Sequence, residues 1–213
     1  SSGGVHSHPD HFHAMVQLAK QRGVSRLFLH LFGDGRDVPE QHFCVDFDLL
    51  RAEVGGQALG TIVSLVGRYF AMDRDRNYAL RTRVAYDLLT HGVGEEVRDL
   101  CEGTRRWYAK APDKEKTDYY IRPLKTPAFQ PIRAEDVCIA VNFRSDRMRQ
   151  LVRALEDETF MEFPRPVRVR DVVCMGPYSH HLPVAFPAVS IPHKLGRIIA
   201  EAGLRQLRIA ETD

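Results

Sequence analysis

The sequence lacks any long hydrophobic run. None of its apolar stretches approaches the roughly 20 residues that a helix needs to cross a bilayer, and the N-terminal residues have neither the basic nor the apolar region of a signal peptide. These absences argue against a membrane protein and against an exported one. They predict a soluble, cytoplasmic protein.

An excess of charge of one sign is also missing. The 213 residues contain 30 Lys and Arg against 28 Asp and Glu, and the basic and acidic residues are interleaved. A nucleic-acid-binding protein would instead show a basic stripe with aromatic residues that stack on bases. The charge pattern therefore predicts no nucleic-acid partner, and any function has to come from local clusters.

Cysteine is scarce and widely spaced. The four cysteines form no C-x-x-C pair, which argues against a zinc ribbon, and the chain is far larger than a miniature protein stapled by disulfides. Free cysteine usually packs as a small apolar residue. We therefore expect four reduced thiols, at Cys44, Cys101, Cys138 and Cys174.

The sequence does contain an alternation of strand-like and helix-like segments. Short apolar runs predict strands at 26–32, 59–66, 117–124, 136–143, 169–176 and 204–210. Apolar residues at helical spacing predict helices at 9–22, 40–54, 77–90, 95–109, 144–156 and 193–202. This alternation predicts an α/β fold, a largely parallel sheet with helices on both faces (an α/β/α sandwich).

Two segments of this predicted fold have particular roles. We expect 136–143 to be a central strand and 117–124 an edge strand, because Pro123 cannot donate to a sheet ladder. The region 103–133 is rich in charge and proline, and we expect it to be an insertion or a flexible connection.

Three of the predicted strands are each followed by arginines. The carboxyl ends of parallel strands meet at one edge of a sheet, where α/β proteins bind their ligands. Guanidinium groups gathered there would repel one another unless they held an anion, and arginine grips carboxylate and phosphate through paired N–H groups. The cluster therefore predicts a site for a small ligand that bears both groups. Its residues, in chain order, are Arg36, Asp37, Arg68, Arg74, Arg144 and Arg147.

A purely structural role for these residues is the competing interpretation. A loop arginine often pairs with a nearby carboxylate and does nothing else. Beside Arg36, Asp37 could accept a proton from a substrate hydroxyl, or it could only brace its loop. The acidic residues available as partners are Asp34, Asp37, Asp73, Asp75 and Asp146.

Four histidines crowd the segment GGVHSHPDHFH, residues 3–13. His6 and His8 point to opposite sides of an extended chain, and His11 and His13 differ by about 200° around a helix, so the four cannot face one ion. We expect no metal site here, with zinc binding as the alternative. His6 follows two glycines and is the best placed of the four to reach a ligand.

Five motifs taken together resemble those of the cofactor-independent (2,3-bisphosphoglycerate-independent) phosphoglycerate mutases. They stand in the order and approximate spacing of that family and span nearly the whole chain. They are GGVHSH (3–8), HLFGDGRDVPE (30–40), GRYFAMDRD (67–75), NFRSDR (142–147) and LRQLRIAET (204–212).

The resemblance implies that residues 1–213 are the inserted substrate-binding (phosphotransferase) domain of such an enzyme. Its partner would be the metal-binding catalytic domain of the same polypeptide, because nothing here matches the family's serine nucleophile or metal ligands. By position, Asp37 would contact the glycerate hydroxyls and assist proton transfer as the catalytic residue. The implied substrate-binding residues are His6, Arg36, Asp37, Arg68, Arg74, Arg144 and Arg147.

The resemblance also implies an activity. Enzymes of this family interconvert 3-phosphoglycerate and 2-phosphoglycerate in glycolysis and gluconeogenesis through a phosphoserine, with two divalent metals, manganese or magnesium, on the other domain. The isolated chain would bind phosphoglycerate as a monomer without turning it over. Its sheet would be truncated at both ends, since the strand expected before SSGG (1–4) is missing and the family pattern continues beyond Asp213. A stand-alone module that binds phosphorylated metabolites without catalysis is the alternative.

Overall fold

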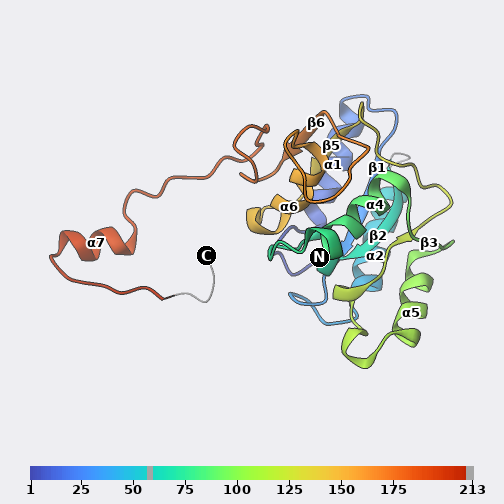
Figure 1. Cartoon of the computed structure of the whole chain (residues 1–213), viewed down its shortest axis with the longest axis horizontal. Coiled ribbons are helices and arrows are strands. Elements are labelled where there is room, and N and C mark those ends of the chain that lie inside the picture. The colour runs from blue at the N-terminus through green and yellow to red at the C-terminus, as the bar shows by residue number, and fades with distance from the viewer. Residues whose placement is uncertain (57–59, 210–213) are drawn as a thin grey trace.

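The computed structural model describes residues 1–56 and 60–209, in an α/β arrangement (Figure 1). Among these residues the strand pairs are parallel, except that β2 and β4 are antiparallel. The α/β class with a mostly parallel sheet is therefore confirmed. The larger sheet has the order β1-β2-β4-β3, with β1 Phe28–Gly33, β2 Thr61–Gly67, β3 Glu95–Glu96 and β4 Leu124–Lys125, and a second sheet pairs β5 (Val137–Ala140) with β6 (Asp171–Cys174).

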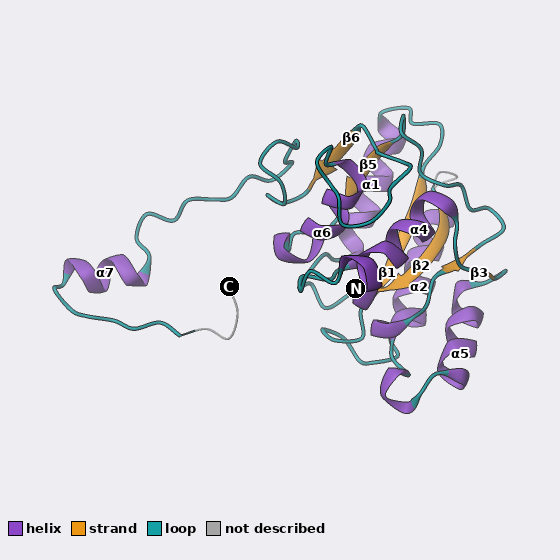
Figure 2. Cartoon of the chain, viewed as in Figure 1, coloured by secondary structure: helices purple, strands orange, loops and turns teal. Residues whose placement is uncertain are grey.

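Apart from α7, the helices lie around the strands (Figure 2). Most of them match the predicted segments within a few residues, whereas the short α3 after β2 is not predicted. None of the described helices is long and apolar enough to span a membrane. The α-helices are α1 (Pro9–Gln21), α2 (Phe43–Gly56), α3 (Arg68–Ala71), α4 (Arg83–His91), α5 (Leu100–Lys110), α6 (Ser145–Glu156) and α7 (Leu195–Glu201), and single turns of other helix types are η1 (Tyr78–Thr82), η2 (Asp113–Glu115) and η3 (Asp118–Tyr120).

Local chemistry sets several helix boundaries. Pro9 stands in the first turn of α1, where its missing N–H leaves no helical bond unmade. The side chain of Asp99 accepts a hydrogen bond from the Glu102 N–H, so the helix predicted from residue 95 begins only at α5. Gly92 ends α4 with a φ of +66°, a conformation that glycine adopts without steric penalty.

Neighbouring residues of β2 face two hydrophobic clusters. Leu65 packs with apolar side chains of α1, α2 and α5, and Val66 packs with those of α4 and α6. Both residues are 0% exposed. Helices thus cover both faces of the larger sheet, as the apolar run around β2 predicts.

The single sheet that the sequence predicts is divided into two. β1 and β5 do not pair, and a cavity of about 710 Å³ lies between them, with apolar side chains of α1 and α6 in its walls. The strand predicted at 136–143 is confirmed as a strand. Its central position is wrong, because β5 pairs only with β6 among the described strands.

The edge strand predicted at 117–124 is also wrong. Most of this segment forms η3 and a loop, and β4 lies between β2 and β3 rather than at the edge. The carboxylate of Asp118, which is 0% exposed, accepts hydrogen bonds from the backbone N–H groups of His42 and Phe43 and so holds the turn against α2. The region 103–133 is therefore built into the fold and is not a loose connection.

The segment 118–121 crosses directly over the ends of β1 and β2. A Cβ atom at Gly33 would lie 2.7 Å from the Asp118 carbonyl oxygen, and one at Gly67 would overlap the Tyr119 carbonyl oxygen. Only glycine allows backbones to approach this closely. Gly33 and Gly67 therefore mark the place where this segment packs against the ends of both strands.

The strand predicted at 204–210 is wrong for the residues that the structure describes. Residues 204–209 form no strand, and Ala210 lies outside the described residues. The segment that carries α7 lies apart from the rest of the molecule (Figure 1), and Leu207 and Ile209 are 83% and 87% exposed. A strand needs a hydrogen-bonded neighbour, and no strand of the described residues pairs with this segment.

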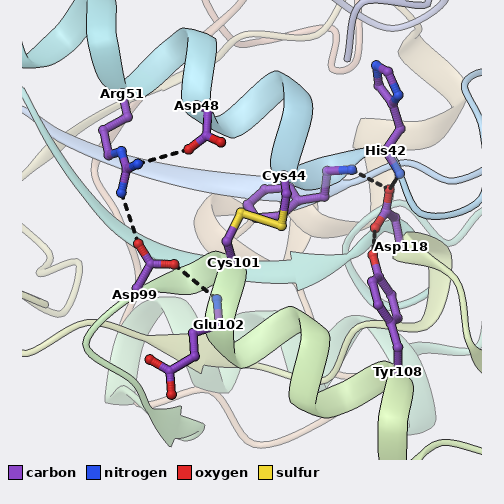
Figure 3. Close-up of a disulfide and its surroundings, with 10 residues drawn as sticks. His42, Cys44, Asp48, Arg51, Asp99, Cys101, Glu102, Tyr108 and Asp118 are labelled. Carbon is purple, nitrogen blue, oxygen red and sulfur yellow. Dashed lines mark hydrogen bonds and ion pairs between the residues drawn. A yellow bond between two sulfur atoms is a disulfide. The ribbon is translucent and has the colours of Figure 1, made fainter.

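The prediction of four reduced thiols is wrong for two of them. Cys44 and Cys101 form a disulfide between the first turns of α2 and α5, with their Cα atoms 5.4 Å apart (Figure 3). They stand 57 residues apart in the sequence, and only the packing of α2 against α5 brings them together. Cys138 and Cys174 are thiols, and burial raises the pKa of Cys138 to about 12 and that of Cys174 to about 11.

Candidate functional site

The loop after β1 is organised by the side chain of Asp34. Its Oδ1 accepts hydrogen bonds from the backbone N–H groups of Arg36 and Asp37, both at 3.2 Å, and its Oδ2 accepts one from the Ser1 hydroxyl at 2.5 Å. Gly35 has a φ of +62°, which glycine tolerates. The loop therefore turns sharply and presents the Asp37 carboxylate to the next strand end.

Arg68 joins this loop to the end of β2. Its Nη1 donates hydrogen bonds to Oδ1 of Asp34 and to Oδ2 of Asp37, both at 2.6 Å. Arg68 is 4% exposed and Asp34 is 7% exposed, and charges this deeply buried are stable only when paired. Burial opposes ionisation of Asp34, but hydrogen bonds from Ser1 and Arg68 outweigh it and hold the pKa of this carboxyl below its ordinary value.

His6 completes this group. Its Nε2 lies 3.1 Å from Oδ2 of Asp37, and the side chain is 4% exposed. Burial, followed by the Arg68 charge, lowers the pKa of His6 to about 4, so the imidazole is neutral at pH 7. The His6 carbonyl oxygen accepts a hydrogen bond from the Phe143 N–H at 2.7 Å, which ties the N-terminal segment to the loop after β5.

Asp146, in the first turn of α6, holds a second group of arginines. Its Oδ2 accepts a hydrogen bond from Nη1 of Arg74 at 3.1 Å, and its Oδ1 accepts one from Nε of Arg144 at 3.0 Å. Arg147 lies farther from this carboxylate, with Nε 3.9 Å from Oδ2, and its Nη1 donates to the Met72 carbonyl oxygen at 3.2 Å. The loops after β2 and β5 are thus joined through one carboxylate.

The two groups belong to one site because their charges act on one another. Burial, followed by the charges of Arg74 and Arg68, lowers the pKa of Arg147. Guanidinium groups this close concentrate positive potential at one edge of the molecule. Within the described residues, the buried Nε atoms of Arg68 and Arg147 have no hydrogen-bond partner. The site therefore holds N–H donors that the described part of the chain leaves unsatisfied.

Arg36 is the predicted site residue that does not join the others. Arg36 is exposed, and its guanidinium group lies over the Tyr119 ring, 5.0 Å from the ring centroid. The residues that do gather at the ends of β1, β2 and β5 are His6, Asp37, Arg68, Arg74, Arg144 and Arg147.

The carboxylates that organise the site were not predicted as site residues. Asp34 and Asp146 enter the sequence interpretation only as partners of surface arginines, yet each joins two strand ends. The competing interpretation, that loop arginines pair with nearby acids, is correct for Arg68, Arg74 and Arg144. These three arginines nevertheless belong to the cluster at the strand ends. The sequence contains one signal for these acids: GDGRD and RSDR each place an aspartate within two residues of a loop arginine.

The histidine-rich segment forms a helix start. Nδ1 of His11 accepts a hydrogen bond from the His8 N–H at 2.9 Å, and Nδ1 of His8 accepts one from the Asp10 N–H at 3.3 Å, so the two imidazoles cap α1. Across residues 1–56 and 60–209, no three His, Cys, Asp or Glu side chains gather as a metal site requires. The described residues thus offer no ligand set for the divalent metals, which the resemblance assigns to the other domain, and we assign no step to a metal here.

Replacement of Asp34 tests its role in the loop. Asp34→Ala is expected to lower the free energy of unfolding by about 2 to 3 kcal/mol, because two backbone N–H groups and Arg68 lose their acceptor. Asp34→Asn keeps an oxygen acceptor and should lose less. Urea unfolding of both variants measures the difference, with Asp48→Ala as the control because its ion pair with Arg51 is 58% exposed on each side. Equal losses in the Ala and Asn variants would contradict the acceptor role.

Comparison with known proteins places this arrangement in context. A family model described as the BPG-independent PGAM N-terminus matches residues 1–180. The whole chain is 41% identical to part of a 2,3-bisphosphoglycerate-independent phosphoglycerate mutase of Symbiobacterium thermophilum and 41% identical to part of one of Moorella thermoacetica, covering 41% and 42% of those proteins. A crystal structure of Leishmania mexicana phosphoglycerate mutase, determined at low cobalt concentration, superposes with a TM-score of 0.83 and 25% sequence identity, over 95% of this chain and 39% of that one. The chain thus spans less than half the length of these proteins.

Proposed function

Since this chain belongs to the family of 2,3-bisphosphoglycerate-independent phosphoglycerate mutases, we propose that it is the substrate-binding (phosphotransferase) domain of an isomerase that interconverts 3-phosphoglycerate and 2-phosphoglycerate in glycolysis and gluconeogenesis. The observation that supports this proposal is the gathering of arginines from the ends of β2 and β5 into two neighbouring groups, one around Asp37 with His6 and one around Asp146. The domain binds the glycerate and the phosphate. The chemistry of phosphoryl transfer is completed outside this chain.

The charge of the site suits such a ligand. A phosphoglycerate carries about three negative charges, nearly two on the phosphate and one on the carboxylate. Arg74, Arg144 and Arg147 share the single carboxylate of Asp146, so their remaining N–H groups are available to anionic oxygens. Burial, and after it repulsion from Arg74 and Arg68, lowers the pKa of Arg147, and a bound anion would relieve that repulsion. These three arginines are therefore the residues that bind the phosphate and the carboxylate.

Asp37 is the residue proposed to act on the substrate hydroxyls. Its carboxylate lies between Nη1 of Arg68 and Nε2 of His6, at 2.6 Å and 3.1 Å. In this position it can accept a hydrogen bond, and then a proton, from a glycerate hydroxyl. The neutral imidazole of His6 can donate or accept a hydrogen bond at the same point without adding charge. Arg36 would contact the ligand only if its guanidinium group moved away from the Tyr119 ring.

The remaining parts of the reaction lie in the length of the relatives that this chain does not cover. We propose that the metal-binding domain of the same polypeptide supplies the serine that takes the phosphoryl group and the ligands for two divalent metals, manganese or magnesium. The isolated chain is then a cytoplasmic monomer that binds phosphoglycerate and does not turn it over. Mutase activity of this chain alone would contradict the division of roles.

Calorimetric titration with 3-phosphoglycerate tests the binding site. At low salt and without metal, the chain is expected to bind, and Arg144→Ala/Arg147→Ala is expected to bind at least about 100-fold more weakly, because two charge-assisted contacts are lost. Arg51→Ala is the matched control, since Arg51 is 58% exposed on α2 and should leave affinity unchanged. Thermal unfolding of each variant checks that the fold is kept.

Two results would contradict the proposal. Equal affinity in the double variant and the Arg51→Ala control would mean that the strand-end arginines do not hold the ligand. Failure of the full-length protein to isomerise phosphoglycerate, with binding by the domain retained, would support a stand-alone binding module instead.

A further inference from the structure

The disulfide between Cys44 and Cys101 lies outside the site formed by Asp37, His6 and the arginines. The loop of residues 34–42 separates the two, with Asp37 near its start and Cys44 just after its end. Both cysteines occupy the first turn of a helix, α2 for Cys44 and α5 for Cys101 (Figure 3). Cys101 is 4% exposed, whereas Cys44 is only half-buried. Cys44 is therefore the more accessible of the two residues to an external thiolate.

The leaving group in such an attack is well placed. Cleavage at Cys44 releases Cys101 as a thiolate in the first turn of α5, where backbone N–H groups stabilise negative charge. A stabilised thiolate leaves faster in thiol–disulfide exchange. The thiols of Cys138 and Cys174 do not compete, because they stand on β5 and β6, away from this helix pair.

The two helices stay together without the bond. Phe47 and Leu50 of α2 and Leu100 of α5 belong to one hydrophobic cluster. Arg51 donates hydrogen bonds to Asp48 and Asp99, both at 2.9 Å, and so bridges the helices beside the sulfur atoms (Figure 3). Reduction would leave the two thiols facing each other, ready to be oxidised again.

The bond also restrains the segment that carries the site loop. The first turn of α2 follows residues 34–42 directly, and the hydrogen bonds from His42 and Phe43 to Asp118 anchor it on one side. The disulfide anchors the same turn to α5. Opening it removes the covalent attachment at the end of this loop and leaves the hydrogen bonds and apolar packing there to hold it.

We propose that Cys44–Cys101 is a reversible thiol–disulfide exchange site, attacked at Cys44 by a small thiol or dithiol, whose state sets the mobility of residues 34–46. In the first step an external thiolate bonds to Cys44 sulfur, the Cys44–Cys101 bond breaks, and the Cys101 thiolate takes up a proton. In the second step another external thiolate attacks the mixed disulfide and releases Cys44. The two protein sulfurs gain two electrons, and the external thiols become a disulfide. None of these steps depends on the proposed substrate.

Serine variants test which sulfur is attacked. Incubation of Cys101→Ser with oxidised glutathione, followed by mass spectrometry, is expected to yield a mixed disulfide at Cys44. Under the same conditions, Cys44→Ser is expected to react at Cys101 at least about tenfold more slowly, because Cys101 is buried. Equal rates in the two variants would overturn the assignment. Thiols at Cys44 and Cys101 that both stay alkylatable in the oxidised wild-type chain would overturn the site itself.

Amide hydrogen exchange tests the link to the loop. Reduction of the wild-type chain with dithiothreitol is expected to speed exchange in residues 34–46 about tenfold, with residues 145–156 of α6 unchanged. The Cys44→Ala/Cys101→Ala variant should exchange like the reduced chain whether or not reductant is present. Identical exchange in oxidised and reduced wild-type chains would overturn the effect on the loop. Because no ligand is used, these outcomes are independent of whether phosphoglycerate binds.

Discussion

Replacement of Arg68 by alanine is expected to lower the free energy of unfolding by about 3 to 5 kcal/mol, because removing one partner of a buried ion pair leaves the other charge unpaired. Arg68 is 4% exposed and its Nη1 holds both Asp34 and Asp37. Without it the two carboxylates lose the cation that they share, and the His6 imidazole beside Asp37 is neutral. Denaturant unfolding followed by circular dichroism measures the loss.

The same variant should change the titration of His6. Burial is the main cause of its low pKa, and the Arg68 charge is the next. With the arginine removed and both carboxylates left in place, the pKa of His6 is expected to rise above its value of about 4. Two-dimensional NMR of the imidazole resonances across pH 4 to 8 follows the shift.

An exposed arginine serves as the control for Arg68. Arg51 also pairs with two carboxylates, Asp48 and Asp99, but it is 58% exposed. Arg51→Ala should cost no more than about 1 kcal/mol, because solvent screens surface pairs. Similar losses in the two variants would mean that Arg68 is not the buried centre of the site. Arg68→Lys should recover part of the stability, since it restores the charge but not the planar donor group.

Replacement of Asp118 by alanine is the second change with a large expected effect. Its Oδ2 accepts hydrogen bonds from the backbone N–H groups of His42 and Phe43, both at 2.8 Å, and its Oδ1 accepts one from the Tyr108 hydroxyl (Figure 3). All three donors lose their partner in the variant. We expect the free energy of unfolding to fall by about 3 kcal/mol. Asp118→Asn keeps an acceptor for the start of α2 and should be far less destabilised.

The Asp118 carboxyl also predicts a pH dependence. Burial raises its pKa from 3.8 to about 6, although its hydrogen bonds act in the opposite direction. The folded state therefore binds a proton more tightly than the unfolded state, so this group stabilises the fold below pH 4, and the stabilisation is lost as the pH rises through 6. The free energy of unfolding of wild type relative to that of Asp118→Asn should fall by about 2 kcal/mol from pH 4 to pH 7.

Unfolding of both proteins at a series of pH values measures this difference directly. A difference that stays constant from pH 4 to 7 would show that Asp118 has an ordinary pKa in the folded chain. The other carboxylates are present in both proteins, so their contributions cancel in the comparison.

The local elements of the fold can be predicted from the sequence because each depends on neighbouring residues. Helical spacing identifies α1, α4 and α6, and the apolar runs identify β1 and β2. Loop arginines directly after strands can be predicted to gather, since parallel strands end at a common edge. The family resemblance extends the same reasoning to the whole chain, through motifs that are each short and local.

The sequence by itself thus determined the α/β class, the family and the residues that carry charge to one edge. Only the tertiary structure decided that Asp34 and Asp146 link the strand ends, that Arg36 lies on Tyr119, and that β1 and β5 stand apart across a cavity. It also decided the pairing of cysteines 57 residues apart. The physical reason is the distance along the sequence between the residues that interact. Periodicity shows which face of a helix or strand is buried, because it depends on neighbouring residues. Ion pairs, disulfides and sheet order depend on which distant elements pack together.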